Sequence, residues 1–369
     1  MWTLKTSLSL SAPAGPFNPM MRSRRLKSTG IGLAFLFLSA CAAAPVKETP
    51  SIFWPKPPDA PKISFVNTWS RPADIGLEPS WFKRVVQFIF GKGKTPYVIR
   101  PSGVAVDGNG GVFVADTGLQ VVHYFDVKQK KYHQLYQITQ NERLQNPIGV
   151  AVDAAGQLYV SDTDLNRIFV FNQKKKMVRV IGNDARAKRM SGLAIDPVRK
   201  RLYAVDTMGH QVLVYSLEGE PRGVIGKRGI EAGTFNFPTY ATVDADGALY
   251  VSDSLNFRVQ VFDAEGKFQS QLGSLGRQLG QFSRPKGVAV DRDKNIYVVD
   301  TLYDTVQVFN SAGELLLNFG ESGESPGTFW LPAGIAVAQD GQIYVADTYN
   351  KRVQIFQRIQ EAPPVIPSG

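Results

Sequence analysis

The chain has 369 residues, of which 43% are hydrophobic and 20% charged, so its composition excludes an intrinsically disordered protein. Its single cysteine, Cys41, excludes a disulfide framework and a metal site built from cysteines. The net charge of +10 is no sign of nucleic-acid binding, because five basic residues precede Cys41 and no acidic residue precedes Glu48. Without those five residues the charge is about +5, a mild surplus.

The N-terminal segment has the pattern of an export signal. A basic stretch at 22–27 precedes the apolar run Ile31–Leu38, which is far shorter than the ~20 residues that span a bilayer. The sequence Leu38–Cys41 (LSAC) resembles the lipobox of bacterial lipoproteins, which implies that Cys41 carries lipid and becomes the mature N-terminus. An ordinary cysteine in an uncleaved segment would leave the basic flank unexplained. We therefore expect residues 1–40 to be a signal peptide.

The residue after this cysteine bears on the location of the protein. Ala42, rather than Asp, resembles lipoproteins sent to the outer membrane of two-membraned bacteria. We expect a lipid-anchored protein in the cell envelope that faces the periplasm. Residues 41–62 are rich in proline and predict an extended tether.

Two elements are expected before the repeats. Ile63–Trp69 (ISFVNTW) predicts a strand with no hairpin partner beside it. Ser80 can cap a short amphipathic helix at about 80–90, which Gly91 ends. This helix has a wide apolar face with a basic edge, so two positions stay open: packed on the propeller or on the membrane surface.

Six related units follow from Arg100 to Phe356. Each contains an aspartate that ends its second strand, and successive aspartates are 46, 44, 47, 47 and 47 residues apart. They are Asp116, Asp162, Asp206, Asp253, Asp300 and Asp347. A period in this range, with four short strands per unit, is typical of propeller blades.

The segment Pro332–Phe356 carries the clearest copy, with PAGIAV, GQIYVADT and NKRVQIF in order. This pattern resembles the NHL repeat, which implies an all-β, six-bladed β-propeller. The sixth copy ends at Phe356 after its third strand, and Ile63–Trp69 can supply the missing strand and close the ring. We expect a propeller over 63–356 and a disordered tail over 357–369.

The repeated aspartates invite a catalytic interpretation, yet a catalytic group is needed once and a turn cap is needed in every blade. Three copies place an arginine five residues later: Arg167, Arg258 and Arg352. We expect an Asp-to-Arg bond within each of these blades. The same structural role is expected of the aspartates at the first-strand turns, such as Asp107.

Departures from the repeat are better candidates for function. Five of the first strands carry a glycine at one position, which we expect to be small because the innermost strands crowd at the axis: Gly103, Gly149, Gly192, Gly287 and Gly334. The fourth copy has Tyr240 there, which is either a ligand contact at the channel mouth or a local repacking of blade four. The third copy places His210 in its turn, where other copies have Asn or Arg nearby.

Catalytic metal chemistry finds little support in the sequence. Peptidyl-hydroxyglycine amidating lyases resemble this chain in fold and use zinc held by histidines, but this chain has only His123, His133 and His210. No nucleophile elbow, Walker loop or paired-carboxylate motif is present. We expect no metal and no cofactor.

The loops that lead into the first strands contribute a set of cations to one face: Arg100, Arg189, Arg284 and Lys286. A positive rim suits an envelope protein or another anionic ligand, unless it is simply a solvated surface. The leading hypothesis is a monomeric, lipid-anchored binding scaffold that does not bind nucleic acid. The alternative is an envelope lyase or hydrolase with a site at the channel mouth beside Tyr240.

Overall fold

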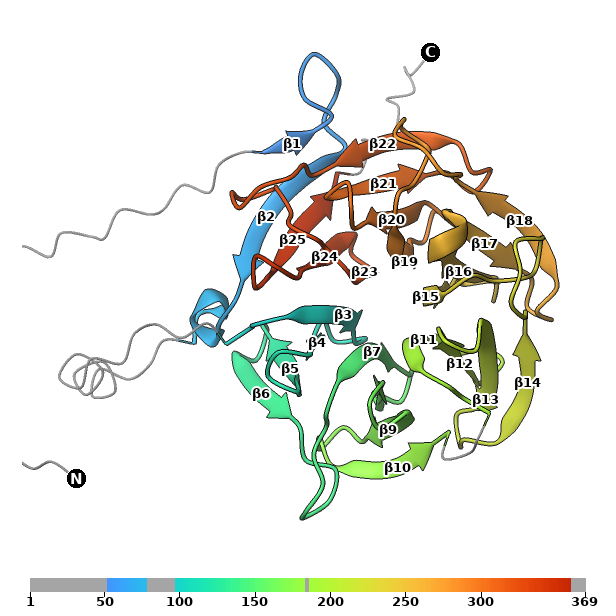
Figure 1. The fold of residues 1–369 in the computed structure, drawn as a ribbon. Coiled ribbons are helices and arrows are strands. Elements are labelled where there is room, and N and C mark those ends of the chain that lie inside the picture. The colour runs from blue at the N-terminus through green and yellow to red at the C-terminus, as the bar shows by residue number, and fades with distance from the viewer. Residues whose placement is uncertain (1–51, 78–96, 183–185, 360–369) are drawn as a thin grey trace, which may run out of the picture. The chain divides into compact units, whose positions relative to one another are not determined.

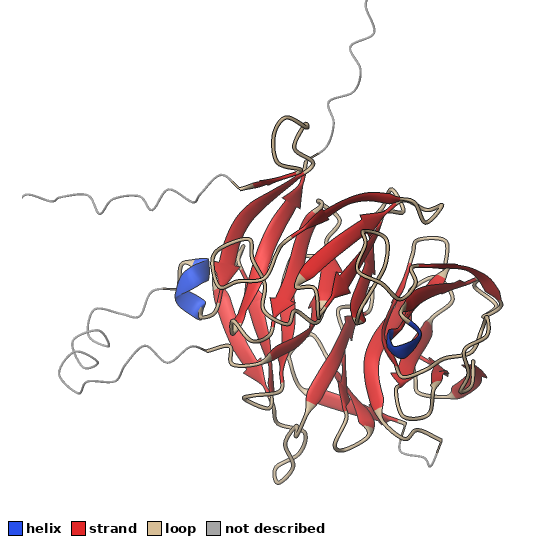
Figure 2. Cartoon of the chain, turned by 45° about the horizontal axis from the view of Figure 1, so that its top comes forward, coloured by secondary structure: helices blue, strands red, loops and turns tan. Residues whose placement is uncertain are grey.

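The computed structural model describes residues 52–77, 97–182 and 186–359, which form a ring of six antiparallel β-sheets (Figure 1). Consecutive strands are neighbours throughout five of the sheets, and the sixth joins strands from both ends of the described chain, so the sheets are propeller blades and the predicted all-β six-bladed propeller is confirmed. Figure 2 shows how little helix accompanies the strands. The helices of the described ranges are two short 3-10 helices, η1 (Pro72–Ile75) and η2 (Ser254–Asn256). The helix expected at about 80–90 lies outside these ranges.

The first strand of each blade lies at the axis of the ring and the fourth at its outside (Figure 1). Blade one contains β3 (Pro101–Val106), β4 (Val112–Asp116), β5 (Val121–Asp126) and β6 (Lys131–Leu135). Blade two contains β7 (Pro147–Val152), β8 (Leu158–Asp162), β9 (Arg167–Phe171) and β10 (Met177–Ile181). Blade three contains β11 (Met190–Asp196), β12 (Arg201–Asp206), β13 (Gln211–Ser216) and β14 (Pro221–Ile225). Blade four contains β15 (Pro238–Val243), β16 (Leu249–Asp253), β17 (Arg258–Phe262) and β18 (Phe268–Leu272). Blade five contains β19 (Pro285–Val290), β20 (Ile296–Asp300), β21 (Thr305–Phe309) and β22 (Leu315–Phe319).

Blade six is built from both ends of the described chain. It contains β1 (Phe53–Trp54), β2 (Ile63–Trp69), β25 (Arg352–Arg358), β24 (Gln342–Asp347) and β23 (Ile335–Val337), in that spatial order. In the β2–β25 ladder Ile63 lies opposite Arg358 and Trp69 opposite Val353, which confirms the predicted ring closure.

The sheet also extends beyond its expected limits. Strand β1 falls within the range 41–62 expected as a tether, and it pairs with β2 because the Trp54 ring packs 5.9 Å from Phe319 and 5.7 Å from Phe356. At the other end, β25 continues to Arg358, two residues beyond the expected end of the propeller.

The apolar core is divided among the boundaries between blades. One cluster, between blades five and six, contains Phe319, Phe329 and Phe356, and each other pair of neighbouring blades shares a cluster of its own. Second strands such as β4 and β8 are buried along their whole length, as expected for strands with apolar residues on both faces. A single blade could therefore not bury its apolar surface alone.

The first strands approach one another closely at the axis. A Cβ atom added to Gly103 would lie 2.3 Å from the carbonyl oxygen of Ile148 in the next blade. Such a contact is impossible without backbone movement, so the recurring glycine has the steric cause expected from the sequence.

Candidate functional site

The loop face is the side of the ring formed by the loops leading into the first strands and by the turns between second and third strands. Its turns are organised by the repeated aspartates. In blade six, the buried Asp347 accepts hydrogen bonds from Trp330 N (2.8 Å), Arg352 Nε (2.7 Å), Asn350 Nδ2 (2.9 Å) and Gln354 Nε2 (3.0 Å). The carboxylate thus ties the loop before the first strand to the turn after the second. This confirms the expected structural role.

The arginine partner differs between blades. Arg258 Nε lies 2.9 Å from Asp253 Oδ2, so the expected bond is confirmed in blades four and six. In blade two the expectation is wrong, because Arg167 extends to Glu142 at 3.7 Å instead of to the aspartate. The aspartate of that blade is already bonded by four backbone amides.

Blade one uses a histidine for the same purpose. The ring of His123 is buried, with Nε2 3.0 Å from Asp116 Oδ2 and Nδ1 2.7 Å from the Tyr132 hydroxyl. Burial alone would raise the pKa of Asp116, but the bonds from His123 and from Ile99 N outweigh it and hold that pKa below its ordinary value. His123 is therefore a structural partner of the aspartate.

In blades three, five and six the threonine after the aspartate joins neighbouring blades, a role that was not predicted from the sequence. In blades one and two it bonds a carbonyl of its own blade instead. Thr301 Oγ1 donates to the carbonyl of Pro332 at 2.7 Å, and Thr348 Oγ1 donates to that of Pro101 at 2.8 Å. Thr207 makes the same bond to Pro238. The repeated Asp-Thr pair was a usable signal, since a side chain that recurs next to a cap has a recurring partner.

His210 has a structural partner as well. Its Nδ1 accepts a hydrogen bond from Phe237 N at 3.2 Å, and its ring packs 4.5 Å from the Phe237 ring. Asp304 occupies the equivalent turn position in blade five and accepts from Leu331 N at 2.7 Å. The buried His210 thus links blades three and four.

Tyr240 lies on β15 and packs, half-buried, against the apolar cluster between blades four and five. Burial of the ring raises the pKa of its hydroxyl. No hydrogen bond joins that hydroxyl to any described residue. The packing agrees with a local repacking of blade four, and the free hydroxyl keeps a ligand contact open.

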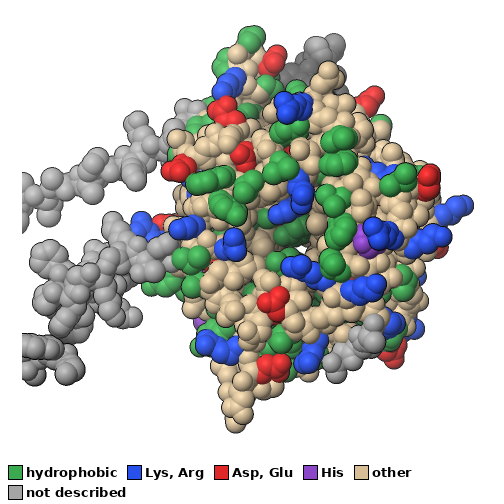
Figure 3. All heavy atoms as spheres, in the orientation of Figure 1, with side chains coloured by type: hydrophobic (Ala, Val, Ile, Leu, Met, Phe, Trp, Pro, Cys, Tyr) green, Lys and Arg blue, Asp and Glu red, His purple; other side chains and the backbone are tan. Residues whose placement is uncertain are grey.

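Three of the expected cations come together. Lys286, on the first strand of blade five, is partly buried, and burial followed by the nearby charges of Arg284 and Arg100 lowers its pKa. We call these three residues the cation cluster. No ion pair or hydrogen bond joins their charged groups to the residues that the structure describes, although Arg100 lies over the Tyr349 ring. Figure 3 shows Lys and Arg side chains around the central opening.

Two exposed aromatic side chains adjoin this cluster and were not singled out from the sequence. Trp330 and Tyr349 are each 45% exposed, with ring centroids 5.7 Å apart. The Arg100 guanidinium lies 5.8 Å from the Tyr349 ring centroid, within the range of a cation–π contact. We call Trp330 and Tyr349 the aromatic pair. Trp330 takes the place of the polar residues Gln145, Asn236 and Ser283 of other blades, and that was a signal available in the sequence. Tyr349 stands where blades three to five already have Met208, Leu255 and Leu302.

Arg189 belongs to another part of the loop face. It is exposed in blade three, whereas the cation cluster draws on blades five and one. The fourth expected cation is therefore on the same face but not in the cluster.

The axial channel offers little chemistry of its own. A cavity of about 180 Å³ within it is lined by Val, Ala, Leu and Ile side chains and by Thr242. No group of His, Cys, Asp or Glu that could hold a metal ion occurs within 52–77, 97–182 and 186–359. The chemistry of the ring is therefore concentrated at its loop face.

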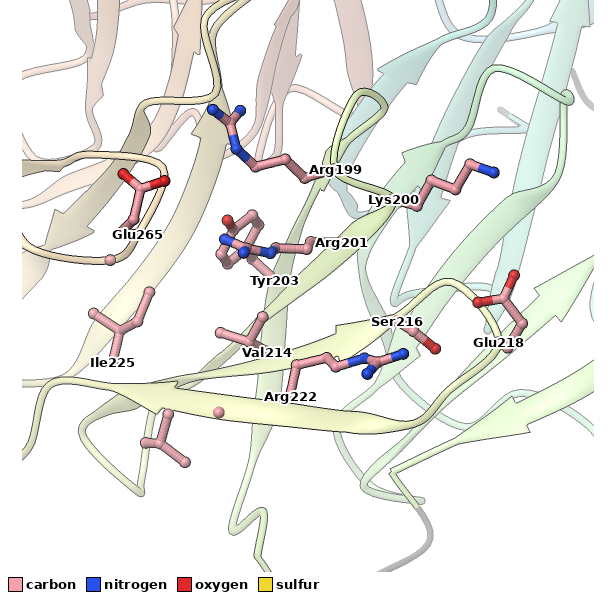
Figure 4. Close-up of a pocket in the computed structure, with 13 residues that line it drawn as sticks. Arg199, Lys200, Arg201, Tyr203, Val214, Ser216, Glu218, Arg222, Ile225 and Glu265 are labelled. Atoms are coloured by element: carbon pink, nitrogen blue, oxygen red, sulfur yellow. The ribbon is translucent and has the colours of Figure 1, made fainter.

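A groove of about 600 Å³ lies against the outer strands of blade three, with Arg199, Arg222, Glu218 and Glu265 among its lining residues (Figure 4). Its arginines already have acceptors within the protein: Arg199 bonds Asp196, and Arg222 bonds Glu220 at 2.6 Å. The groove carries both signs of charge, and these two guanidinium groups already bond acceptors within the protein. It is therefore a weaker candidate for a ligand site than the cation cluster.

Two expectations concern the remaining parts of the chain. Cys41, the expected lipidation site, lies outside the described residues, as does the tail from 360 onward. Within the described ranges, no helix combines the length and apolar character needed to cross a membrane.

Family models match separate stretches of the chain. The NHL repeat matches residues 144–171 and 329–356, which fall in blades two and six. A six-bladed β-propeller model matches residues 240–305, in blades four and five. No curated protein sequence matches the chain.

Solved structures share the fold at low sequence identity. A protein of unknown function from Bacteroides thetaiotaomicron has 18% identity and a TM-score of 0.56, covering 72% of this chain and 70% of its own. Virginiamycin B lyase from Staphylococcus aureus has 13% identity and a TM-score of 0.51, covering 70% and 95%. A chain of a nidogen–laminin complex has 19% identity and a TM-score of 0.52, covering 69% and 87%. The ring geometry and these likenesses show a six-bladed β-propeller fold, and two of its blades match the NHL repeat.

Proposed function

We propose that the chain is a binding propeller whose cation cluster holds an anionic group of a partner. The observation that carries the proposal is Lys286, a partly buried ammonium group whose nearest charges are two further cations. Partial burial of the Lys286 ammonium beside the charges of two exposed arginines, without an acidic partner among the described residues, costs free energy, so the arrangement is not explained by stability. Perturbed groups of this kind are typical of functional sites.

The proposed partner is an envelope protein or another anionic ligand, bound by one propeller. The fold supports this class of function, since the similar structures include a chain from a complex between two proteins, nidogen and laminin. Fold alone does not identify a partner, so the proposal depends on the loop face.

Charge reversal tests the proposal, with polyglutamate as the probe. Changing Arg100, Arg284 and Lys286 together to Glu should weaken its binding at least about tenfold, or 1.4 kcal/mol. The control is Lys128→Glu, because Lys128 is exposed in a turn on the opposite face. Equal losses in both variants would overturn the proposal.

For location, we propose a lipid anchor at Cys41 and a periplasm-facing position at the outer membrane. The support is the lipobox-like sequence LSAC and the basic and apolar segments before it. The variant Cys41→Ser should not incorporate labelled fatty acid and should leave the membrane fraction. Unchanged labelling would refute the anchor.

A second candidate is a lyase or hydrolase that acts at the channel mouth beside Tyr240. The free hydroxyl of Tyr240 favours it, and a lyase is among the proteins that share the fold. Metal analysis of the purified propeller separates the two functions. A stoichiometric metal that is lost in channel-mouth variants would favour the enzyme.

A further inference from the structure

Resting on the proposed function, we infer that the partner is an acidic protein segment with apolar side chains, and that the aromatic pair receives those side chains. The proposed function requires only an anion. The surroundings of the three cations indicate what accompanies the negative charge on the partner.

Exposed apolar side chains share the loop face with the cations of the cluster. Arg100 lies over the Tyr349 ring, and Trp330 adjoins that ring. In blade five, Thr301 N donates to the carbonyl of Arg284 at 3.1 Å, and the next residue, Leu302, has a side chain that is 52% exposed. The loop face of blades five, six and one therefore carries both cations and exposed apolar side chains.

The aromatic pair is also held in place before any partner arrives. Tyr349 N donates to the Trp330 carbonyl at 3.1 Å, and Trp330 N donates to the buried Asp347. A fixed backbone lowers the entropy lost when these rings bind a partner. Exposed Trp, Tyr and Arg residues on a rigid frame are the residue types that contribute most energy to protein interfaces.

The charge of the surface selects among protein partners and argues against other occupants. A second copy of this chain would bring its own cation cluster against the first, and such like-charge contact is unfavourable. A polysaccharide could stack on the aromatic pair, but Leu302 offers a sugar neither a stacking surface nor a hydrogen bond. An acidic segment with apolar side chains satisfies both kinds of contact.

Selection from a random peptide library on the folded full chain tests the inference. Enriched peptides should combine Asp or Glu with aromatic or aliphatic residues. Their affinity should fall about tenfold in Trp330→Ala or Tyr349→Ala, a loss of 1.4 kcal/mol. Polyglutamate should bind both variants within about twofold of the original protein, because the cations remain. As a control, Val198→Ser removes an exposed apolar side chain from the opposite face and should change neither affinity.

The outcomes separate the inference from the function on which it rests. Peptides that are acidic but indifferent to Trp330→Ala, or a selection that enriches nothing, would overturn the inference. The proposed function would survive that result if polyglutamate binding still depends on Lys286. Tighter, Lys286-dependent binding of polygalacturonate than of any selected peptide would also overturn the inference, in favour of an acidic polysaccharide. Loss of the Lys286 dependence itself would overturn the proposed function.

Discussion

Arg352 in a blade turn and Arg100 in the cation cluster lie on the same face of the ring, yet their surroundings are opposite. The Arg352 guanidinium is nearly buried and donates to Asp347 and to three backbone carbonyls, those of Glu324, Ser325 and Thr328. Arg100 is exposed, and within the described part of the chain its guanidinium lies over the Tyr349 ring and near the charge of Lys286, with no acidic partner.

The difference teaches how a repeat protein divides its charged residues. Arg258 and Arg352, which bond the repeated aspartates, are satisfied inside the protein and hold turns in place. Arg100, Arg284 and Lys286 have no acidic partner among the described residues and remain available for a ligand. Three variants test this division and one tests the closure of the ring, taken from the largest expected effect to the smallest.

Replacing Arg352 with Met should lower the free energy of unfolding by about 3 kcal/mol, because the buried Asp347 loses its cationic partner. The loss would be measured by urea unfolding at neutral pH. Arg167→Met is the matched control, since Arg167 and Glu142 are 3.7 Å apart and each more than a third exposed. Arg167→Met should lower the free energy of unfolding by less than about 0.5 kcal/mol. Equal costs would contradict the division.

Replacing Trp54 with Ala should lower the free energy of unfolding by about 2 kcal/mol. The ring packs against Phe319 and Phe356 at the boundary between blades five and six, so its removal weakens ring closure. Phe53→Ala changes the more exposed neighbour in the same strand and should have little effect in the same unfolding experiment. A larger loss of stability in Phe53→Ala than in Trp54→Ala would show that the pairing of β1, and not the contact of the Trp54 ring, stabilises ring closure.

Replacing His123 with Gln should cost about 1 kcal/mol at pH 7. The folded pKa of Asp116 is lowered, so its ionised form adds stability above the ordinary pKa of about 3.9, and that stability is lost as the pH falls through the folded value. The variant should lose less stability than the original protein on acidification. Gln already occupies this position in other blades, as at Gln354, and His133→Gln on an outer strand is the control. An unchanged acid profile would contradict the role of His123.

Replacing Lys286 with Met should weaken polyglutamate binding and yet raise stability slightly at pH 7. The folded pKa of Lys286 is lowered, so its charged form costs stability below that pKa, and the cost disappears as the pH rises through it. The stability advantage of the variant should therefore vanish at high pH. Lower stability of the variant at pH 7 would show that Lys286 is a structural residue.

The fold could be predicted from the sequence because the same pattern recurs in all six units. The spacing of six aspartates, the glycines of the first strands and the incomplete sixth copy predicted the blades, the crowded axis and the closure by β2. The extra strand β1 was missed because only two residues pair, in a proline-rich stretch without alternation.

The candidate site was less accessible from sequence because it depends on contacts between blades. Arg100, Arg284 and Lys286 were all expected on one face, but their association and the separation of Arg189 follow from the ring. His210 looked exceptional in the sequence, and only the bond from Phe237 N shows that it replaces other acceptors at the same position. Trp330 and Tyr349 are 19 residues apart, and only the backbone bond between them brings the rings together.

The pairing of β2 with β25 also sets an order of folding. β2 leaves the ribosome early, but its partner is about 290 residues further along the chain, which at 5 to 20 residues per second is roughly 15 to 60 s of synthesis. Until β25 emerges, β2 can pair with β1 on one edge, but its other edge has no partner within its own sheet. The last step of folding therefore joins the earliest strands of the sheet to the latest one, and any factor that holds the chain unfolded has to protect that first edge until the final strand is made.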